Sequence, residues 1–153
     1  MSSPGLCVIC AYPAARQGHL CKKHRKSYSF DQRYGVYRLK PRRKVSEPQS
    51  KLYRNVKKIY RIPVLQEVTF DWYPYARYDI VVCDAKTIFE FDGEQHFKYV
   101  PHFHKTREGF AAYVEKSRNK QQVAESLGWK VKRFSYVENV ADIEYVRKVI
   151  DLK

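Results

Sequence analysis

The amino-acid sequence predicts an α/β fold in which a mixed sheet is flanked by helices and preceded by a small N-terminal zinc-binding module. After about residue 46, apolar segments with the two-residue period of strands alternate with segments of helical period. Before that point, paired cysteine and histidine residues have the spacing of a zinc site. The chain has 153 residues, 44% of them hydrophobic, enough for one compact domain beside such a module. We therefore expect a zinc knuckle and basic linker over 1–45 and the α/β core over 46–153.

The expected elements of the core follow from periodicity and from the positions of proline and glycine. They are a helix over 48–60, strands over 64–70, 77–83 and 87–92, a helix over 109–127, a strand over 129–134 and a helix over 140–151. Pro48 suits the first turn of the first helix, and Gly128 is a natural stop for the second. Asn139 is expected to cap the last helix. We interpret 71–74 as a turn and the aromatic, basic segment 97–108 as a loop.

The charge balance indicates a polyanionic partner. Lys and Arg number 30 against 16 Asp and Glu, which gives a net charge of +14. This excess is typical of proteins that bind a phosphate backbone, although a merely basic, ribosomal-type protein has the same composition. No apolar run is long enough to cross a membrane, and the first residues lack the apolar stretch of a secretory signal. We expect a cytoplasmic protein with no membrane partner and no disulfides.

The basic residues expected to contact nucleic acid lie in the N-terminal third of the chain. Some follow the cysteines of the zinc candidate, and the others form the basic linker. They are Lys22, Lys23, Arg25, Lys26, Arg38, Lys40, Arg42, Arg43 and Lys44. Lysine and arginine at such density would hold the phosphate backbone without reading its sequence.

The zinc candidate consists of Cys7 and Cys10, a gap of ten residues, and then Cys21 and His24. Three thiolates and one imidazole in two tight pairs satisfy the tetrahedral coordination of Zn²⁺. His19 is an alternative fourth ligand that breaks the paired spacing. Four protein ligands leave no open coordination position, so the expected role is structural. The arrangement resembles a treble-clef zinc finger.

An acidic cluster is expected within the core. Asp79 lies in one predicted strand, and Glu90 and Asp92 lie two residues apart in the next, on the same face. Neighbouring carboxylates are costly to bury unless a cation compensates them, and oxygen ligands suit Mg²⁺. We expect Asp79 and Glu90 to hold Mg²⁺, with Asp92 as direct or water-mediated support. Lys120 lies on the sheet-facing stripe of its helix, where we expect it to meet a carboxylate or a substrate phosphate.

Several motifs occur in order along the chain. They are Arg77-Tyr78-Asp79, then Phe89-Glu90-Phe91-Asp92-Gly93-Glu94-Gln95-His96, then Lys120, then Gly128-Trp129-Lys130-Val131-Lys132-Arg133-Phe134. This series resembles the very-short-patch-repair-like and phage homing-endonuclease branch of the PD-(D/E)xK nucleases. The lysine that usually follows the second acidic residue of that motif is replaced here by Asp92, and we expect Lys120 to supply the missing cation.

The resemblance implies a restriction-endonuclease-like fold and a Mg²⁺-dependent DNA endonuclease. A homing endonuclease of a phage or mobile element is one form of such an enzyme. If a phage encodes it, the expected location is the host cytoplasm. Gln95 would orient a phosphate or a water, and His96 would orient or deprotonate the attacking water or protonate the leaving oxygen. The alternatives are a nuclease specific for mismatched or branched DNA and a non-catalytic zinc-finger nucleic-acid binder. The expected partner is DNA, and the expected oligomeric state is a monomer or a homodimer.

Overall fold

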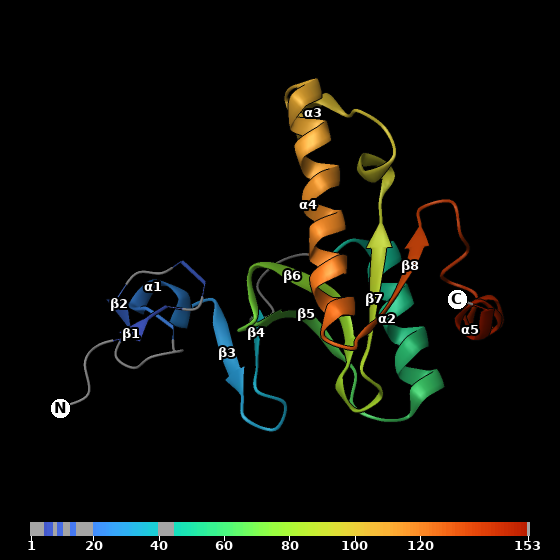
Figure 1. Ribbon diagram of the computed structural model, residues 1–153. Helices are drawn as coiled ribbons and strands as arrows, with labels where there is room; N and C mark the ends of the chain where they lie inside the picture. Colours follow the sequence, from blue (N-terminus) through green and yellow to red (C-terminus); the bar gives the residue numbers. More distant parts are fainter. Residues whose placement is uncertain (1–4, 8, 11–12, 15–19, 40–44, 153) are drawn as a thin grey trace.

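The computed structural model describes the chain except for residues 1–4, 8, 11–12, 15–19, 40–44 and 153 (Figure 1). The N-terminal elements are β1 (Gly5–Leu6), β2 (Pro13–Ala14), α1 (Lys22–Arg25), β3 (Tyr28–Asp31) and β4 (Val36–Leu39). The core elements are α2 (Glu47–Tyr60), β5 (Leu65–Phe70), β6 (Tyr73–Val82), η1 (Cys83–Ala85), β7 (Thr87–Asp92), η2 (Glu94–His96), α3 (Pro101–His104), α4 (Arg107–Ser126), β8 (Lys130–Ser135) and α5 (Ile143–Leu152).

The central sheet is mixed, as the sequence predicts. Six strands lie in the order β3-β4-β5-β6-β7-β8, and β1 and β2 form a separate two-stranded sheet. Neighbours in the large sheet are antiparallel except β7 and β8, which run parallel. A parallel pair requires a crossover connection, and the segment that contains α4 provides it. The register of this pair sets Glu90 beside Arg133.

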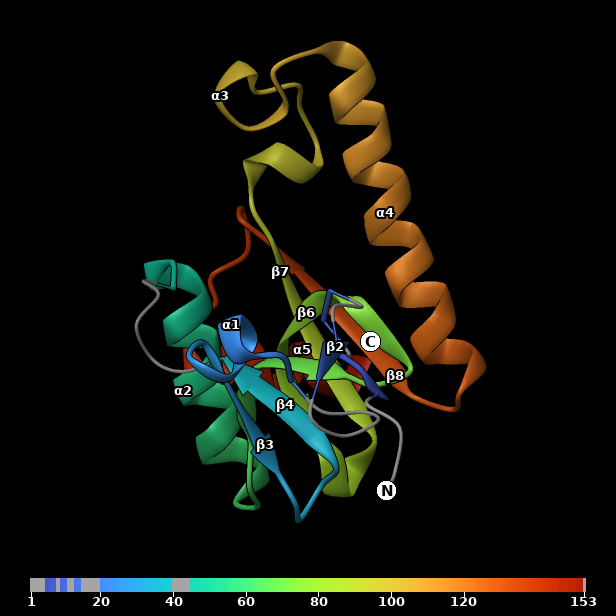
Figure 2. The same cartoon turned by 90° about the vertical axis from the view of Figure 1, so that its left-hand side faces the viewer.

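Helices cover both faces of the sheet. On one face, Leu52 and Val56 of α2 and Val146 of α5 pack against Phe89 and Phe134. On the other face, Ala124 of α4 packs against a cluster that includes Tyr78 and Ile88. Figures 1 and 2 show α4 standing along the sheet and extending beyond it toward α3. The architecture is therefore three layers, and the acidic residues that alternate with the core residues of β7 face α4.

The core elements confirm the predicted order and differ from the prediction mainly at their ends. The last helix begins at Ile143 instead of residue 140, because the Asp142 carboxylate accepts a hydrogen bond from the backbone N–H of Glu144 and takes the capping role expected of Asn139. Strand β6 already begins at Tyr73, inside the expected turn. The expected loop contains α3, and α4 begins at Arg107. Leu127, expected on the buried stripe of that helix, is 44% exposed.

The hairpin of β3 and β4 was not predicted. It pairs Tyr28 to Asp31 with Val36 to Leu39, and β4 continues the sheet by pairing with β5. Gly35 closes the hairpin with φ of +65°, a conformation that favours glycine. The buried residues Tyr28 and Tyr37 of this hairpin share a small apolar cluster with Cys7 and Cys21, so the cysteine-containing segment packs on the edge of the sheet. No helix in the described part of the chain is long and apolar enough to cross a membrane.

Candidate metal centre and acidic pocket

The Cys/His cluster has the composition that the sequence predicts. One ligand atom each from Cys7, Cys10, Cys21 and His24 lies within 4.8 Å of all the others. Cys21 caps the short helix α1, and this turn brings His24 back toward the sulfurs. The alternative ligand His19 lies outside the described residues. The cluster could therefore hold a metal ion such as zinc.

The distances within the cluster fit tetrahedral coordination. Zn–S bonds of roughly 2.3 Å give edges of about 3.8 Å between sulfurs. The Cys10 and Cys21 Sγ atoms are 3.7 Å apart, and His24 Nδ1 lies 3.6 Å from Cys7 Sγ and 3.4 Å from Cys21 Sγ. Burial raises the pKa of the Cys7 thiol, but hydrogen bonds from backbone groups outweigh this and lower it to about 6. A thiolate at neutral pH is the form that binds a metal.

The expected nucleic-acid contacts are only partly described. Lys22, Lys23, Arg25 and Lys26 are exposed on and just after α1. Arg38 lies on β4, where its guanidinium is 3.8 Å from the Asp31 carboxylate. The remaining expected contacts lie outside the described residues; they are Lys40, Arg42, Arg43 and Lys44.

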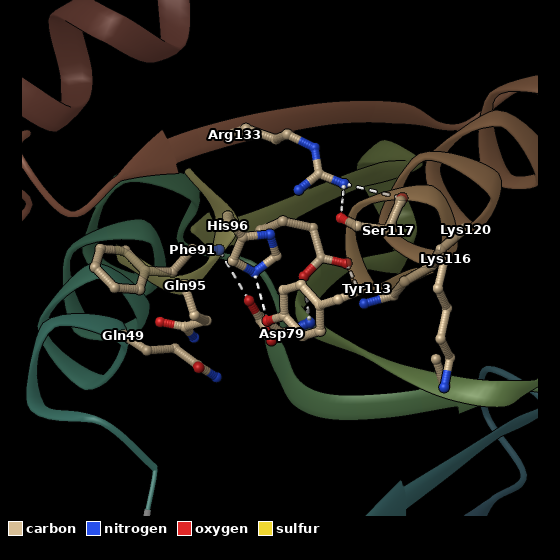
Figure 3. A pocket seen from close by; sticks show the side chains of 12 residues that line it. Gln49, Asp79, Phe91, Gln95, His96, Tyr113, Lys116, Ser117, Lys120 and Arg133 are labelled. Atoms are coloured by element: carbon tan, nitrogen blue, oxygen red, sulfur yellow. Dashed lines mark hydrogen bonds and ion pairs between the residues drawn. The ribbon is translucent and has the colours of Figure 1, made fainter. Parts of the chain in front are cut away.

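The acidic pocket forms where β6 and β7 separate. Their backbone ladder ends at Ile80 and Phe89. Beyond it, the Asp79 carboxylate accepts a hydrogen bond from the Phe91 N–H at 2.8 Å, and the Asp79 N–H donates to the Glu90 carboxylate at 3.3 Å. Two acidic side chains thus replace ladder hydrogen bonds and stay close together. They line a cavity of about 320 Å³, which Figure 3 shows with its other lining residues.

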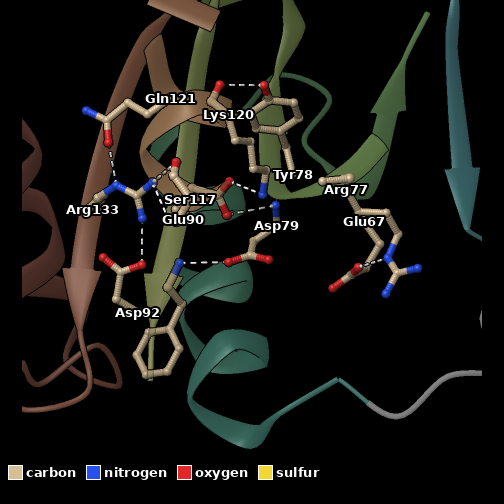
Figure 4. A network of polar contacts seen from close by, with 12 residues as sticks. Glu67, Arg77, Tyr78, Asp79, Glu90, Asp92, Ser117, Lys120, Gln121 and Arg133 are labelled. Atoms are coloured by element: carbon tan, nitrogen blue, oxygen red, sulfur yellow. Dashed lines mark hydrogen bonds and ion pairs between the residues drawn. The ribbon is translucent and has the colours of Figure 1, made fainter. Parts of the chain in front are cut away.

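Lys120 comes from α4 to this pair of carboxylates. Its ammonium group forms an ion pair with Glu90, whose side chain is almost completely buried, and lies 4.5 Å from the centre of the Tyr78 ring (Figure 4). The Tyr78 hydroxyl in turn donates to the Lys120 carbonyl oxygen at 2.8 Å. The structure therefore brings Lys120 to a carboxylate, as expected, whereas Arg118 on the same helix is exposed.

The electrostatics of the two carboxylates are coupled. Burial and the neighbouring Glu90 charge raise the pKa of Asp79 well above its usual value. Burial also acts to raise the pKa of Glu90, but the Lys120 ammonium, the hydrogen bond with Asp79 and the Arg133 charge together outweigh it, so that the pKa of Glu90 is lowered. One ammonium group thus compensates one of two neighbouring acids, and a further cation would favour ionisation of both.

Asp92 does not join this pair but forms a second polar group with Arg133 and His96. Its carboxylate is 2.6 Å from Arg133 Nη1 and 3.4 Å from His96 Nδ1. Burial raises the pKa of Asp92, against the lowering effect of Arg133. His96 Nε2 lies 3.0 Å from the Tyr113 hydroxyl, and burial lowers the pKa of the imidazole. With Nδ1–H directed at Asp92, Nε2 is the basic nitrogen and accepts from Tyr113.

Several residues of this pocket were not assigned a role by the sequence analysis. The lining includes Gln49, Tyr113, Lys116, Ser117 and Arg133 together with the expected Gln95 and His96. Arg133 also donates to Ser117 and Gln121, which fixes its guanidinium between β8 and α4. Arg133 alternates with Phe134 along β8, and this pattern indicates that the two side chains point to opposite faces of the sheet. The strand register that sets Arg133 beside Glu90 cannot be predicted from one sequence.

Three further polar residues, Glu67, His104 and Glu47, contact residues other than the acidic pair. Glu67 accepts hydrogen bonds from Gln49 at 2.9 Å and from Arg77 at 2.8 Å, and its φ of +55° breaks the regular strand. The buried His104 accepts from the Val100 N–H at 2.9 Å. Glu47 is exposed and pairs with Arg54.

No protein-family description matches this sequence, and comparison with curated proteins and with solved structures gave no match.

Proposed function

We propose that the protein is a Mg²⁺-dependent endonuclease that hydrolyses phosphodiester bonds in DNA. The observation that carries the proposal is the pair of Asp79 and the buried Glu90, which faces a cavity beside Lys120 in a chain of net charge +14. A protein that only binds phosphates gains nothing from acidic groups at such a cavity, because they repel the ligand. The ordered motifs that resemble the very-short-patch-repair-like and phage homing-endonuclease branch support the same activity.

Asp79 and Glu90 would hold the Mg²⁺ ion. Both supply carboxylate oxygens, the ligands that this ion prefers, and a cation there would offset the repulsion that raises the pKa of Asp79. Two protein ligands leave positions for water and phosphate, which Mg²⁺ sites commonly retain. When bound, the ion would act as a Lewis acid toward the phosphate and would lower the pKa of a water.

The side chains around the pair would bind and orient the substrate. Lys120, held at Glu90 by its ion pair, would stabilise negative charge that develops on the phosphate. His96, oriented by Asp92, would accept at Nε2 a proton that the Tyr113 hydroxyl donates, and Tyr113 would take its replacement from the attacking water. Arg133 would keep the Asp92 carboxylate in place for this task. Gln95 lines the same cavity and would orient the phosphate.

The experiment that tests this proposal uses the full chain loaded with zinc. Supercoiled plasmid and a branched DNA are incubated with the protein in Mg²⁺ and, in parallel, in EDTA. Nicked or linear plasmid that forms only in Mg²⁺ is the expected result. Preference for the branched substrate would favour the structure-specific nuclease over one that cuts ordinary duplex.

A non-catalytic zinc-finger nucleic-acid binder is the second candidate function. Two observations favour it: the exposed basic residues beside the Cys/His cluster, and the ion pair by which Lys120 already compensates Glu90 without a metal ion. This candidate predicts tight DNA binding with no cleavage of any DNA or RNA substrate in Mg²⁺ or Mn²⁺. If zinc-loaded protein binds DNA tightly and cleaves none of these substrates, the non-catalytic binder replaces the nuclease as the proposed function.

A further inference from the structure

A second cavity adjoins the acidic pocket on the side of the Cys/His cluster. It has a volume of about 410 Å³, and we call it the module-side cavity because Ile9 and Tyr28 form one of its walls. Ala76, Asp79 and Lys116 line both cavities. The Asp79 side chain therefore lies at the junction of two hollows instead of at the end of one.

The module-side cavity also has two charged lining residues, Glu67 and Arg77, whose charges compensate each other. Glu67 and Arg77 form an ion pair with 2.8 Å between Oε2 and Nε, and Arg77 Nη1 donates to the Tyr28 hydroxyl at 3.3 Å. The carboxylate of Glu67 is thus offset by a guanidinium, so its repulsion of a bound phosphate is reduced. The same contacts fasten the cysteine-containing segment, through β3, to β5 and β6.

Lys116 supplies positive charge at the junction. It is exposed on α4, and its side chain extends away from the hydrogen-bonded lining residues in Figure 3. The Lys116 ammonium group borders both the acidic pocket and the module-side cavity. If a substrate phosphate binds at Asp79, this ammonium group can therefore reach the next phosphate of the strand. Neighbouring phosphates of a strand are close enough for such shared contacts, and lysine binds them as a point charge.

We propose that the module-side cavity binds the nucleotide next to the scissile phosphate, with Lys116 contacting the backbone at the junction. The inference rests on the proposed function and adds a substrate subsite to it. An endonuclease cuts inside a strand, so the strand must continue on both sides of the reacting phosphate. Two cavities that meet at Asp79 provide this continuity, and the N-terminal module becomes a wall of the substrate cleft.

Steady-state cleavage by Lys116→Ala tests the contact at the junction, with Lys148→Ala on α5 as the matched control because Lys148 is exposed and lines neither cavity. Lys116→Ala is expected to raise KM about tenfold with kcat within about twofold, and to lower the slope of log K against log salt by about one. Lys148→Ala is expected to match the parent protein. Equal KM and equal slope in the two variants would overturn the subsite.

Photocrosslinking in EDTA tests the cavity without requiring cleavage. Replacing Tyr28 by p-azidophenylalanine keeps the ring and puts the reactive group where the hydroxyl lies, and the same replacement of Tyr145 on α5 is the control. A bound oligonucleotide should crosslink through the Tyr28 position and not through the Tyr145 position. If the parent protein cleaves DNA but neither position crosslinks, the subsite is wrong and the proposed function stands. If crosslinking occurs without cleavage in Mg²⁺, the cavity binds the strand and the nuclease function is wrong.

Discussion

The Cys/His cluster and the acidic pocket are both candidate metal sites, and they differ in what they leave open. The cluster gathers four ligand atoms within 4.8 Å of one another, the number that a tetrahedral zinc ion takes. The acidic pocket brings two carboxylates to the wall of a cavity of about 320 Å³ and leaves room for a substrate. A closed site can only stabilise structure, whereas an open one can do chemistry. We therefore propose a structural role for the cluster and a catalytic role for the acidic pocket.

The two regions also differ in how their side chains are held. Asp79, Glu90 and Lys120 project from strands and a helix that share a buried core with Tyr78 and Ile88. Among the described residues, the buried partners of the cluster are chiefly Leu20, Tyr28 and Tyr37. A small apolar cluster of this kind cannot stabilise a module alone, so a metal ion bound there would supply the folding energy.

The largest effect is expected from removing zinc. Apparent binding free energies of structural zinc reach roughly 10 kcal/mol, so chelation or Cys10→Ser should unfold the N-terminal segment while the core sheet stays folded. Metal analysis of the parent protein should give about one zinc per chain. Hydrogen exchange should show loss of protection in β1, β2 and α1 after chelation, with β6 to β8 unchanged. Full zinc content in Cys10→Ser would contradict the ligand assignment.

The next effect concerns the ion pair of the acidic pocket. Lys120→Ala leaves Glu90 buried and uncompensated, which should lower the free energy of unfolding by about 3 kcal/mol. Urea denaturation measures this change. The double variant with Glu90→Gln should recover part of the loss, because no unpaired charge then stays buried. Additive losses in the double variant would mean that the two side chains are not energetically coupled. Cleavage should fall in Lys120→Ala although Mg²⁺ binding persists.

A smaller effect is expected at the basic surface beside the cluster. The affinity of the parent protein for DNA should fall by orders of magnitude between low and moderate salt. Replacing Lys22 and Lys23 by alanine should lower the slope of log K against log salt by about two and leave kcat unchanged. A flat plot for the parent protein would contradict backbone binding, and an unchanged slope in the double variant would move the contact surface elsewhere.

The smallest effect is expected at Gly93, directly after β7. Its φ of −70° suits any residue, so Gly93→Ala should change stability by about 0.5 kcal/mol or less. A Cβ atom there would lie 2.5 Å from Gln95 Oε1, however, and would push this flexible side chain aside. Cleavage should therefore fall severalfold with unchanged denaturation, which kinetics and thermal melts measure together. Unchanged cleavage would indicate that Gln95 does not contact the substrate.

Much of this architecture was predictable because its signals are local. Pro48, Gly128 and the apolar periods mark the core helices and strands, and alternation along β7 sets Glu90 and Asp92 on one face. The hairpin of β3 and β4 was missed because four-residue strands carry little periodicity in a basic, polar stretch. Only the turn residue Gly35 marked it.

Tertiary partners of the site were less predictable than the elements that carry them. Asp92 was expected beside the other carboxylates, but the parallel pairing of β7 and β8 supplies Arg133 on the same face, and Asp92 pairs with it. Strand register depends on contacts far apart in sequence, so the sequence alone does not determine it. Lys120 was predictable because a lysine on a buried helical stripe requires an acidic partner.

The most direct test of the central claim is plasmid cleavage by Glu90→Gln in Mg²⁺. This substitution removes a charged ligand while keeping its shape, and Glu94→Gln is the matched control because Glu94 is exposed after the strand. We expect a loss of cleavage of roughly 100-fold or more in Glu90→Gln, with DNA binding retained and Glu94→Gln unaffected. Adding Asp79→Asn should cost little more, since both residues would act on one ion. Parental cleavage by Glu90→Gln would contradict the assignment of the acidic pocket as the catalytic site.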